Sequence, residues 1–153
     1  MKSECCIPGT DNLILIRTLA EFRFEMRRFL HFSESAAVEA GLQPQQHQLL
    51  LQVAGAPEAT KVTIAYAAER LGLKHNSAVE LVDRSEREGL LSRAADSADK
   101  RRAILKVTRK GNQILSRLSG EHARELNELA PRLALALKNI RLHKQVAVNA
   151  GNP

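Results

Sequence analysis

Four neighbouring residues carry side chains that can donate or accept hydrogen bonds: Lys74, His75, Asn76 and Ser77. They follow a glycine turn at Gly72, and behind them apolar residues recur at helical spacing from Ala78 to Val82. The N-terminus of a helix also offers backbone N–H groups and a positive dipole end, which bind phosphate. The segment therefore predicts a helix whose first turn contacts nucleic acid. The alternative is that Asn76 or Ser77 only caps this helix.

A second candidate set lies in residues 100–110, KRRAILKVTRK, which hold six basic residues and no acidic one. Two short β-like stretches, LLSRAA and RAILKVT, surround the turn-forming segment DSADKR and predict a hairpin. An arginine at such a turn can enter a minor groove, where negative potential is focused. We expect Arg101 at the tip, Asp99 bracing it by an ion pair, and Lys100 and Arg102 as phosphate contacts or alternates.

Cap and turn residues predict the limits of the helices that must position these side chains. Thr63 is expected to cap a helix over 64–71, and a second helix then runs over 75–88. Two helices joined by a tight turn and followed by a hairpin make a winged helix-turn-helix, which we place at residues 41–110. The second helix can enter the major groove of duplex DNA end first, because their widths match. Val79 and Arg84 are further candidate contacts on this helix.

Longer helices are expected on both sides of the winged helix. Residues 11–40 are apolar on more than one face, so this helix must be covered on more than one side. Pro44 suits the first position of a helix ending near Ala54, and Thr108 suits the cap of a helix ending near Leu129. Pro131 is expected to start or kink a sixth helix.

The predicted fold class is therefore mainly α with a small β-hairpin wing. A lone winged helix does not need the apolar surface of residues 11–40 or of residues 111–146. We interpret both segments as dimerisation helices, although they could instead complete the core of a monomer. Residues 1–10 are expected to be disordered and residues 147–153 to form a frayed tail.

From about Gly41 to Gly111 the chain resembles the MarR family of bacterial transcriptional regulators. The matching stretches are GLQPQQHQLLLQV, VTIAYAAERLGLKHNSAVELVDRSEREGL and DSADKRRAILKVTRKG. The last of these carries the family's wing pattern, Asp-x-x-Asp-x-Arg, followed by a strand and Thr-x-x-Gly. The resemblance implies a homodimer that binds a pseudo-palindromic operator, usually as a repressor, with Asp99 and Arg101 as a pair in the wing.

The resemblance also implies release from DNA by a small aromatic or anionic effector. The segments that could line its pocket supply four candidates: Phe24, Arg27, His31 and His47. Each has a simpler interpretation as a core residue or a solvated one. Two positions depart from the family pattern: Ala67 and Ser85 stand where larger apolar residues are usual. Their small side chains predict a loosely packed helix pair unless a neighbour fills the space.

Other functions are weaker alternatives. The acidic residues Glu80, Asp83, Glu86 and Glu88 would suit a winged helix that binds protein, and structured RNA fits a winged helix less well than DNA does. Cys5 and Cys6 raise a redox-sensing alternative, but the surrounding sequence differs from that of oxidant-sensing relatives.

Composition narrows the class of protein further. The formal charge of +6 suits a polyanionic partner, and the absence of Trp argues against a base-stacking platform. No catalytic or metal-ligand spacing, phosphate loop, signal peptide or membrane span is expected. The sequence thus predicts a cytoplasmic DNA-binding protein without a cofactor, and not an enzyme.

Overall fold

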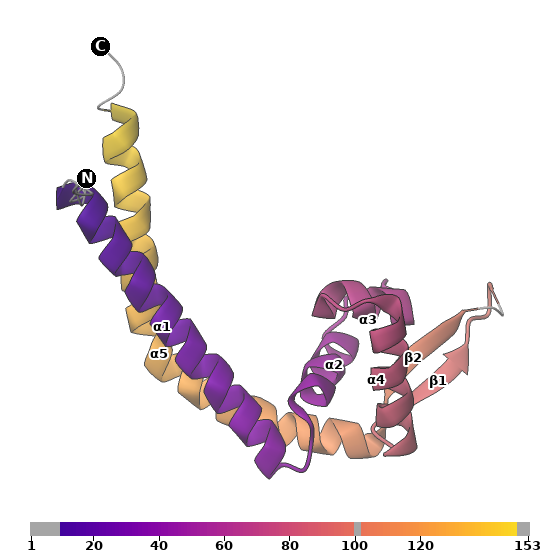
Figure 1. The fold of residues 1–153 in the computed structure, drawn as a ribbon. Helices are drawn as coiled ribbons and strands as arrows, with labels where there is room; N and C mark the ends of the chain where they lie inside the picture. Colours follow the sequence, from indigo (N-terminus) through magenta and orange to yellow (C-terminus); the bar gives the residue numbers. More distant parts are fainter. Residues whose placement is uncertain (1–9, 100–101, 150–153) are drawn as a thin grey trace, which may run out of the picture. The chain divides into compact units, whose positions relative to one another are not determined.

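The computed structural model describes residues 10–99 and 102–149 of the 153-residue chain. Its elements, in chain order, are α1 (Thr10–Glu39), α2 (Pro44–Ala54), α3 (Ile64–Leu71), α4 (His75–Arg87), β1 (Leu91–Ala95), β2 (Ala103–Val107) and α5 (Arg109–Asn149) (Figure 1). The fold is mainly helical with one antiparallel hairpin, so the predicted fold class is confirmed. Contacts divide the chain into two units, the winged-helix unit (Ser33–His122) and the helix-pair unit (Met1–Phe32 with Ala123–Pro153).

Local signals set the helix ends in the winged-helix unit. The Thr63 hydroxyl accepts a hydrogen bond from the Tyr66 backbone N–H at 3.2 Å, which confirms the predicted cap of α3. Gly72 then adopts a left-handed conformation with φ 64°, which a residue with a Cβ rarely tolerates. The turn between α3 and α4 therefore depends on this glycine.

The core of the winged-helix unit is a continuous apolar cluster. Its largest fully buried apolar side chains come from α2, α4, α5 and the start of the wing: Leu49, Leu50, Leu81, Leu90 and Leu118. The two small residues at the α3–α4 contact, Ala67 and Ser85, are both fully buried. The Ser85 hydroxyl donates to the Leu81 carbonyl at 2.8 Å, so its polar atom is satisfied within its own helix. Solvent does not reach this contact despite the smaller side chains.

The start of α5 explains the Thr-x-x-Gly pattern. The Thr108 hydroxyl donates to the Gly89 carbonyl at 2.6 Å and accepts from the Gly111 N–H at 3.1 Å, as a cap should. A Cβ on Gly111 would lie 2.4 Å from the Leu90 carbonyl oxygen. Because that distance is a steric clash with backbone, only glycine fits there. Thr108 and Gly111 thus allow the start of α5 to pack against the residues that precede β1.

Two predictions about helix ends are wrong. One continuous helix passes through Pro131, where the sequence predicts a fifth helix ending near Leu129 and a sixth beginning or kinking at the proline. Proline removes one backbone hydrogen bond, but Leu129 and Ala136, two turns apart on one face, are both buried, which favours continuation. Helix α5 also extends to Asn149, so residues 147–149 are helical rather than frayed. Residues 1–9 and 150–153 lie outside the described part.

The helix-pair unit has a different character. In its described part, α1 and α5 bury few side chains, and large apolar residues stay exposed on both helices: Ile14, Ile16, Leu19, Phe24, Met26, Leu30, Leu126, Leu135, Leu137 and Leu142. One of the few buried side chains in this unit is charged: Glu25 is only 7% exposed. Its carboxylate pairs with Arg132 at 3.0 Å and with Arg28 at 3.3 Å, so the buried charge is compensated.

Candidate nucleic-acid interface

The four polar residues of the sequence motif all lie exposed at the start of α4: Lys74, His75, Asn76 and Ser77. Lys74 is the N-cap residue, and its side chain makes no capping hydrogen bond. Asn76 and Ser77 lie inside the first turn, not at the cap, so the capping alternative is wrong for both. The opposite face of α4 is anchored by Ala78, Leu81, Val82 and Ser85, all buried. The buried face therefore fixes α4 in the unit, while the polar first turn of the helix stays exposed to solvent.

The two further candidates on α4 are less accessible. Val79 and Arg84 are both half-buried. The guanidinium of Arg84 donates to the side-chain oxygen of Gln43, just before α2. Arg84 thus has a partner inside the unit, and reaching a phosphate requires it to share or exchange that partner.

The wing follows α4 as an antiparallel hairpin in which Leu91 pairs with Val107 and Ala95 with Ala103. Arg102 lies at its end, with a side chain 62% exposed and its Nε 3.5 Å from the Asp99 carboxylate. The other two predicted wing contacts, Lys100 and Arg101, lie outside the described residues. Of the predicted wing positions, the described part therefore places Arg102 on the surface and Asp99 beside it.

Sequence reasoning missed the most buried acidic residue of the wing, Asp96. Its carboxylate lies 2.9 Å from the Lys61 ammonium and accepts the Ala98 N–H at 3.0 Å. The Ala98 N–H first, and then Lys61, hold the pKa of Asp96 below its usual value. Asp96 is the first acidic residue of the Asp-x-x-Asp-x-Arg pattern, and that position was the signal that could have revealed it.

Arg93 on β1 is a second ion-paired residue that the sequence did not single out. Its guanidinium forms ion pairs with Asp83 and Glu86 of α4, the latter at 2.6 Å. The hydrogen bond to Asp83 is the main cause that raises the pKa of Arg93. Of the residues that suggested a protein-binding surface, Asp83 and Glu86 are thus neutralised, and Glu88 accepts a hydrogen bond from Gln46 at 2.9 Å. This pairing weakens the protein-binding alternative.

The four candidate effector residues are divided between the two units. His47 belongs to α2 of the winged-helix unit, whereas Phe24, Arg27 and His31 belong to α1 of the helix-pair unit. These three are exposed, with Phe24 56% exposed. Within each unit the structure therefore gathers at most three of the four.

His47 is 1% exposed and neither ring nitrogen has a hydrogen-bond partner. Its ring lies 4.9 Å, between centroids, from that of His122, at an angle of 45°. Burial, and secondarily the charge of His122, lower the pKa of His47 from 6.5 to about 4. His122 Nε2 is hydrogen-bonded to the Ser33 hydroxyl at 2.7 Å. The cluster thus joins α1, α2 and α5 through the two imidazole rings and the Ser33 hydroxyl.

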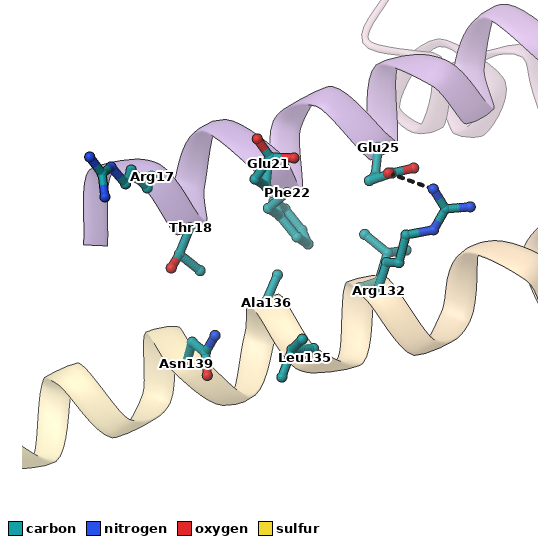
Figure 2. Close-up of a pocket in the computed structure, with 10 residues that line it drawn as sticks. Arg17, Thr18, Glu21, Phe22, Glu25, Arg132, Leu135, Ala136 and Asn139 are labelled. Atoms are coloured by element: carbon teal, nitrogen blue, oxygen red, sulfur yellow. Dashed lines mark hydrogen bonds and ion pairs between the residues drawn. The ribbon is translucent and has the colours of Figure 1, made fainter. Parts of the chain in front are cut away.

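The helix-pair unit contains a pocket of about 310 Å³. Figure 2 shows that its lining residues come from α1 and α5, with Thr18 and Phe22 of α1 pointing toward Ala136 and Asn139 of α5. The ion pair between Glu25 and Arg132 lies at one end, and Phe22, Leu135 and Ala136 supply apolar surface. A small molecule or a side chain of another protein could occupy a space of this size.

Two further features concern only the described residues. Within 10–99 and 102–149, no three His, Cys, Asp or Glu side chains cluster as metal ligands would. None of the helices in these ranges combines the length and apolar character needed to cross a membrane. Cys5 and Cys6, the basis of the redox alternative, lie outside the described residues.

Comparison with known proteins agrees with this architecture. Residues 40–102 match the family model described as MarR family. A proposed transcriptional regulatory protein for the hcr operon of Thauera aromatica is 27% identical over 119 residues, covering 74% of this chain and 70% of that protein.

Two solved structures show the same fold. MepR, a transcription regulator of the Staphylococcus aureus multidrug efflux pump MepA, superposes with a TM-score of 0.65 at 16% identity, covering 83% of this chain and 94% of MepR. The repressor CouR bound to a 23-mer DNA duplex gives a TM-score of 0.61 at 23% identity, covering 83% of this chain and 88% of CouR. At these identities the likeness shows the fold.

The helix-turn-helix followed by a two-stranded wing thus defines a winged-helix protein. The family model adds that residues 40–102 of this chain are similar to the MarR family. The resemblance inferred from the sequence motifs is confirmed.

Proposed function

We propose that this protein is a homodimeric transcriptional regulator that binds a pseudo-palindromic duplex DNA site, acting as a repressor in the cytoplasm. One observation carries the proposal. The first turn of α4 exposes Lys74, His75, Asn76 and Ser77, while its opposite face is buried in the core. A rigidly held helix end with exposed donors and acceptors is what base readout in a major groove requires.

The wing supports the same assignment. Arg102 is exposed, and Asp99 restrains its guanidinium, so less side-chain freedom is lost on binding. With Lys100 and Arg101 beside it in sequence, the wing offers three adjacent positive charges to phosphates or to a minor groove. Phosphate contacts of this kind make DNA affinity fall with rising salt concentration.

A second copy of the chain is the proposed cover for the helix-pair unit. Its large apolar side chains are exposed on both helices, and Leu135 is 61% exposed. An exposed apolar surface of this extent marks an interface. A two-fold dimer would present two α4 helices about 34–36 Å apart, the spacing of half-sites one DNA turn apart. The DNA complexes of CouR and of a MepR mutant are consistent with DNA as the partner.

Selection of bound sites from random duplexes tests this function directly. A two-fold symmetric consensus is expected, with binding that weakens steeply as salt rises. Ser77→Ala and Asn76→Ala should each relax the preference at particular bases, whereas the exposed Ala59→Ser on the loop before α3 serves as a matched control. Equal retention of scrambled and selected duplexes would show that the winged helix does not read DNA, and would favour a protein-binding module.

A small aromatic or anionic effector is the proposed release signal. CouR from Rhodococcus jostii RHA1 has been solved with p-coumaroyl-CoA, at 24% identity to this chain and a TM-score of 0.57. We propose Phe24, Arg27, His31 and His47 as candidate contacts. Titration of the protein–DNA complex with p-coumaroyl-CoA, coenzyme A and p-coumarate separates recognition of an acyl thioester from recognition of either half. A complex that all three leave intact would count against this effector class.

A further inference from the structure

One ion pair joins the segment before α3 to the root of the wing. The Lys61 ammonium lies 2.9 Å from both carboxylate oxygens of Asp96, although the two residues are 35 positions apart. Asp96 directly follows β1 and is only 4% exposed, whereas about half of the Lys61 side chain is exposed. A buried carboxylate that engages a half-exposed lysine in this way fixes one backbone segment against another.

Asp96 also organises the loop that carries the exposed arginine. Its side chain accepts the Ala98 N–H, and its backbone N–H donates to the Arg102 carbonyl at 3.1 Å. The Arg102 N–H in turn donates to the Asp99 carbonyl at 2.9 Å. One residue therefore contacts both sides of the loop root, at Ala98 and at Arg102.

A backbone contact reinforces the same connection. The Leu105 N–H of β2 donates to the Val62 carbonyl at 2.8 Å, directly beside Lys61 in sequence. Thr63, one residue later, caps α3. The segment 61–63 thus touches β2 by its backbone, the loop root by the Lys61 side chain, and the helix-turn-helix by continuity of the chain.

We propose that Lys61 is a positioning residue for DNA binding, which acts through Asp96 to fix the wing in the orientation that presents Arg102 to the duplex. The inference rests on the DNA-binding function proposed above. Without this ion pair, the loop must lose more conformational freedom when it binds, and that loss lowers affinity.

Lys61 could instead contact a phosphate itself, and Asp96→Asn separates the two roles by sign. Asparagine retains an oxygen that can accept the Ala98 N–H but lacks the charge that holds Lys61. Removing a negative charge should by electrostatics alone tighten binding to DNA. If Asp96 positions the wing, the same substitution weakens binding. The two roles thus predict opposite changes in Kd.

The experiment measures Kd for the selected duplex with the full chain at fixed salt. Asp96→Asn and Lys61→Met are each expected to weaken binding by about fivefold or more, on the scale of a lost wing contact, and Lys61→Arg to retain most affinity. Lys138→Met removes the same charge from the helix-pair unit and is the matched control. In the Lys61→Met background, Arg102→Ala should cost much less than it does in the wild type, because the wing is already misplaced.

Two readouts separate positioning from a loss of stability. Thermal unfolding should show Lys61→Met folded at the assay temperature. Amide hydrogen exchange of the free protein should accelerate at Ala98 and Arg102 but not within α4. If Asp96→Asn does not fold, Lys61→Met with its half-exposed side chain carries the test alone.

Asp96→Asn binding as tightly as wild type or tighter would overturn the proposal. So would independent, multiplicative effects of Lys61→Met and Arg102→Ala. If the wild type itself shows no preference for any duplex, the proposed function fails and this inference falls with it. That outcome is distinguishable because it appears before any variant is made.

Discussion

The two units of this chain solve the problem of apolar surface in opposite ways. In the winged-helix unit, residues such as Leu49, Leu81 and Leu118 are fully buried in one cluster. In the helix-pair unit, side chains of the same type, such as Leu135 and Leu137, remain about half exposed or more. The first unit has a core of its own, whereas the second leaves apolar side chains exposed, as the proposed dimer interface requires.

This difference indicates a division of labour between the units. A reader of DNA needs side chains held in a fixed geometry, and a buried core with ion pairs such as Arg93 to Asp83 supplies that rigidity. A dimerisation surface instead needs apolar side chains that stay available until two chains meet. Each unit therefore has the burial that its proposed role requires.

The largest effect on stability is expected when a leucine is replaced by alanine in the winged-helix unit, and the same replacement in the helix-pair unit gives the comparison. Leu81→Ala should lower the free energy of unfolding by about 2–5 kcal/mol, because it leaves a cavity in a closed core. Leu135→Ala should have a smaller effect that depends on protein concentration, because in the proposed dimer its side chain is buried only when two chains associate. Urea unfolding at several protein concentrations measures both. Equal, concentration-independent losses would show that the two units do not differ as proposed.

Acidification should next affect the winged-helix unit through His47. The folded state keeps this ring neutral down to a pKa of about 4, whereas the unfolded chain takes up a proton near pH 6.5. The contribution of His47 to the free energy of unfolding is therefore fully present above pH 6.5. It is lost as the pH drops toward 4, by up to about 3 kcal/mol. Unfolding of wild type and of His47→Leu across this range gives the difference. A wild-type curve parallel to that of the variant would contradict the assignment.

A charge placed in the helix-pair unit should weaken dimerisation by about tenfold or more, since it must be desolvated in the interface. Leu135→Glu is the test, and Ala59→Glu adds the same charge to an exposed loop of the winged-helix unit as a control. Sedimentation equilibrium measures the association constant of each variant. A Leu135→Glu protein that dimerises like wild type would place the interface elsewhere.

The smallest effect on folding is expected from a substitution at Arg101. Arg101→Ala should weaken binding to the selected duplex by roughly 1–3 kcal/mol, if the residue reaches base edges, and should leave folding intact. Fluorescence anisotropy and thermal unfolding, measured on one preparation, check both parts. Unchanged affinity would remove this arginine from the mechanism, whereas an unfolded variant would give it a structural role.

The helix boundaries were largely predictable because they depend on nearby residues. The predicted limits of α2 and α3 agree with the structure, and so do the caps at Thr63 and Thr108. A cap bonds residues three positions apart, and helical periodicity is visible within two turns, so both are local properties. Position 131 shows where local rules end: proline signals a break, yet tertiary burial on both sides keeps the helix continuous.

The polar residues at the start of α4 were likewise visible as a motif, and the family resemblance explained their place. The bracing residues were not predictable in this way. Asp96 meets a lysine 35 positions away, and Glu88 meets Gln46 at a separation of 42. Such pairs form only after the chain has folded, because neither partner lies within the other's local segment. The sequence by itself determined which residues are exposed at the start of α4, through caps and periodicity. Only the tertiary structure decided which polar side chains pair across the winged-helix unit, because those partners lie far apart in the chain.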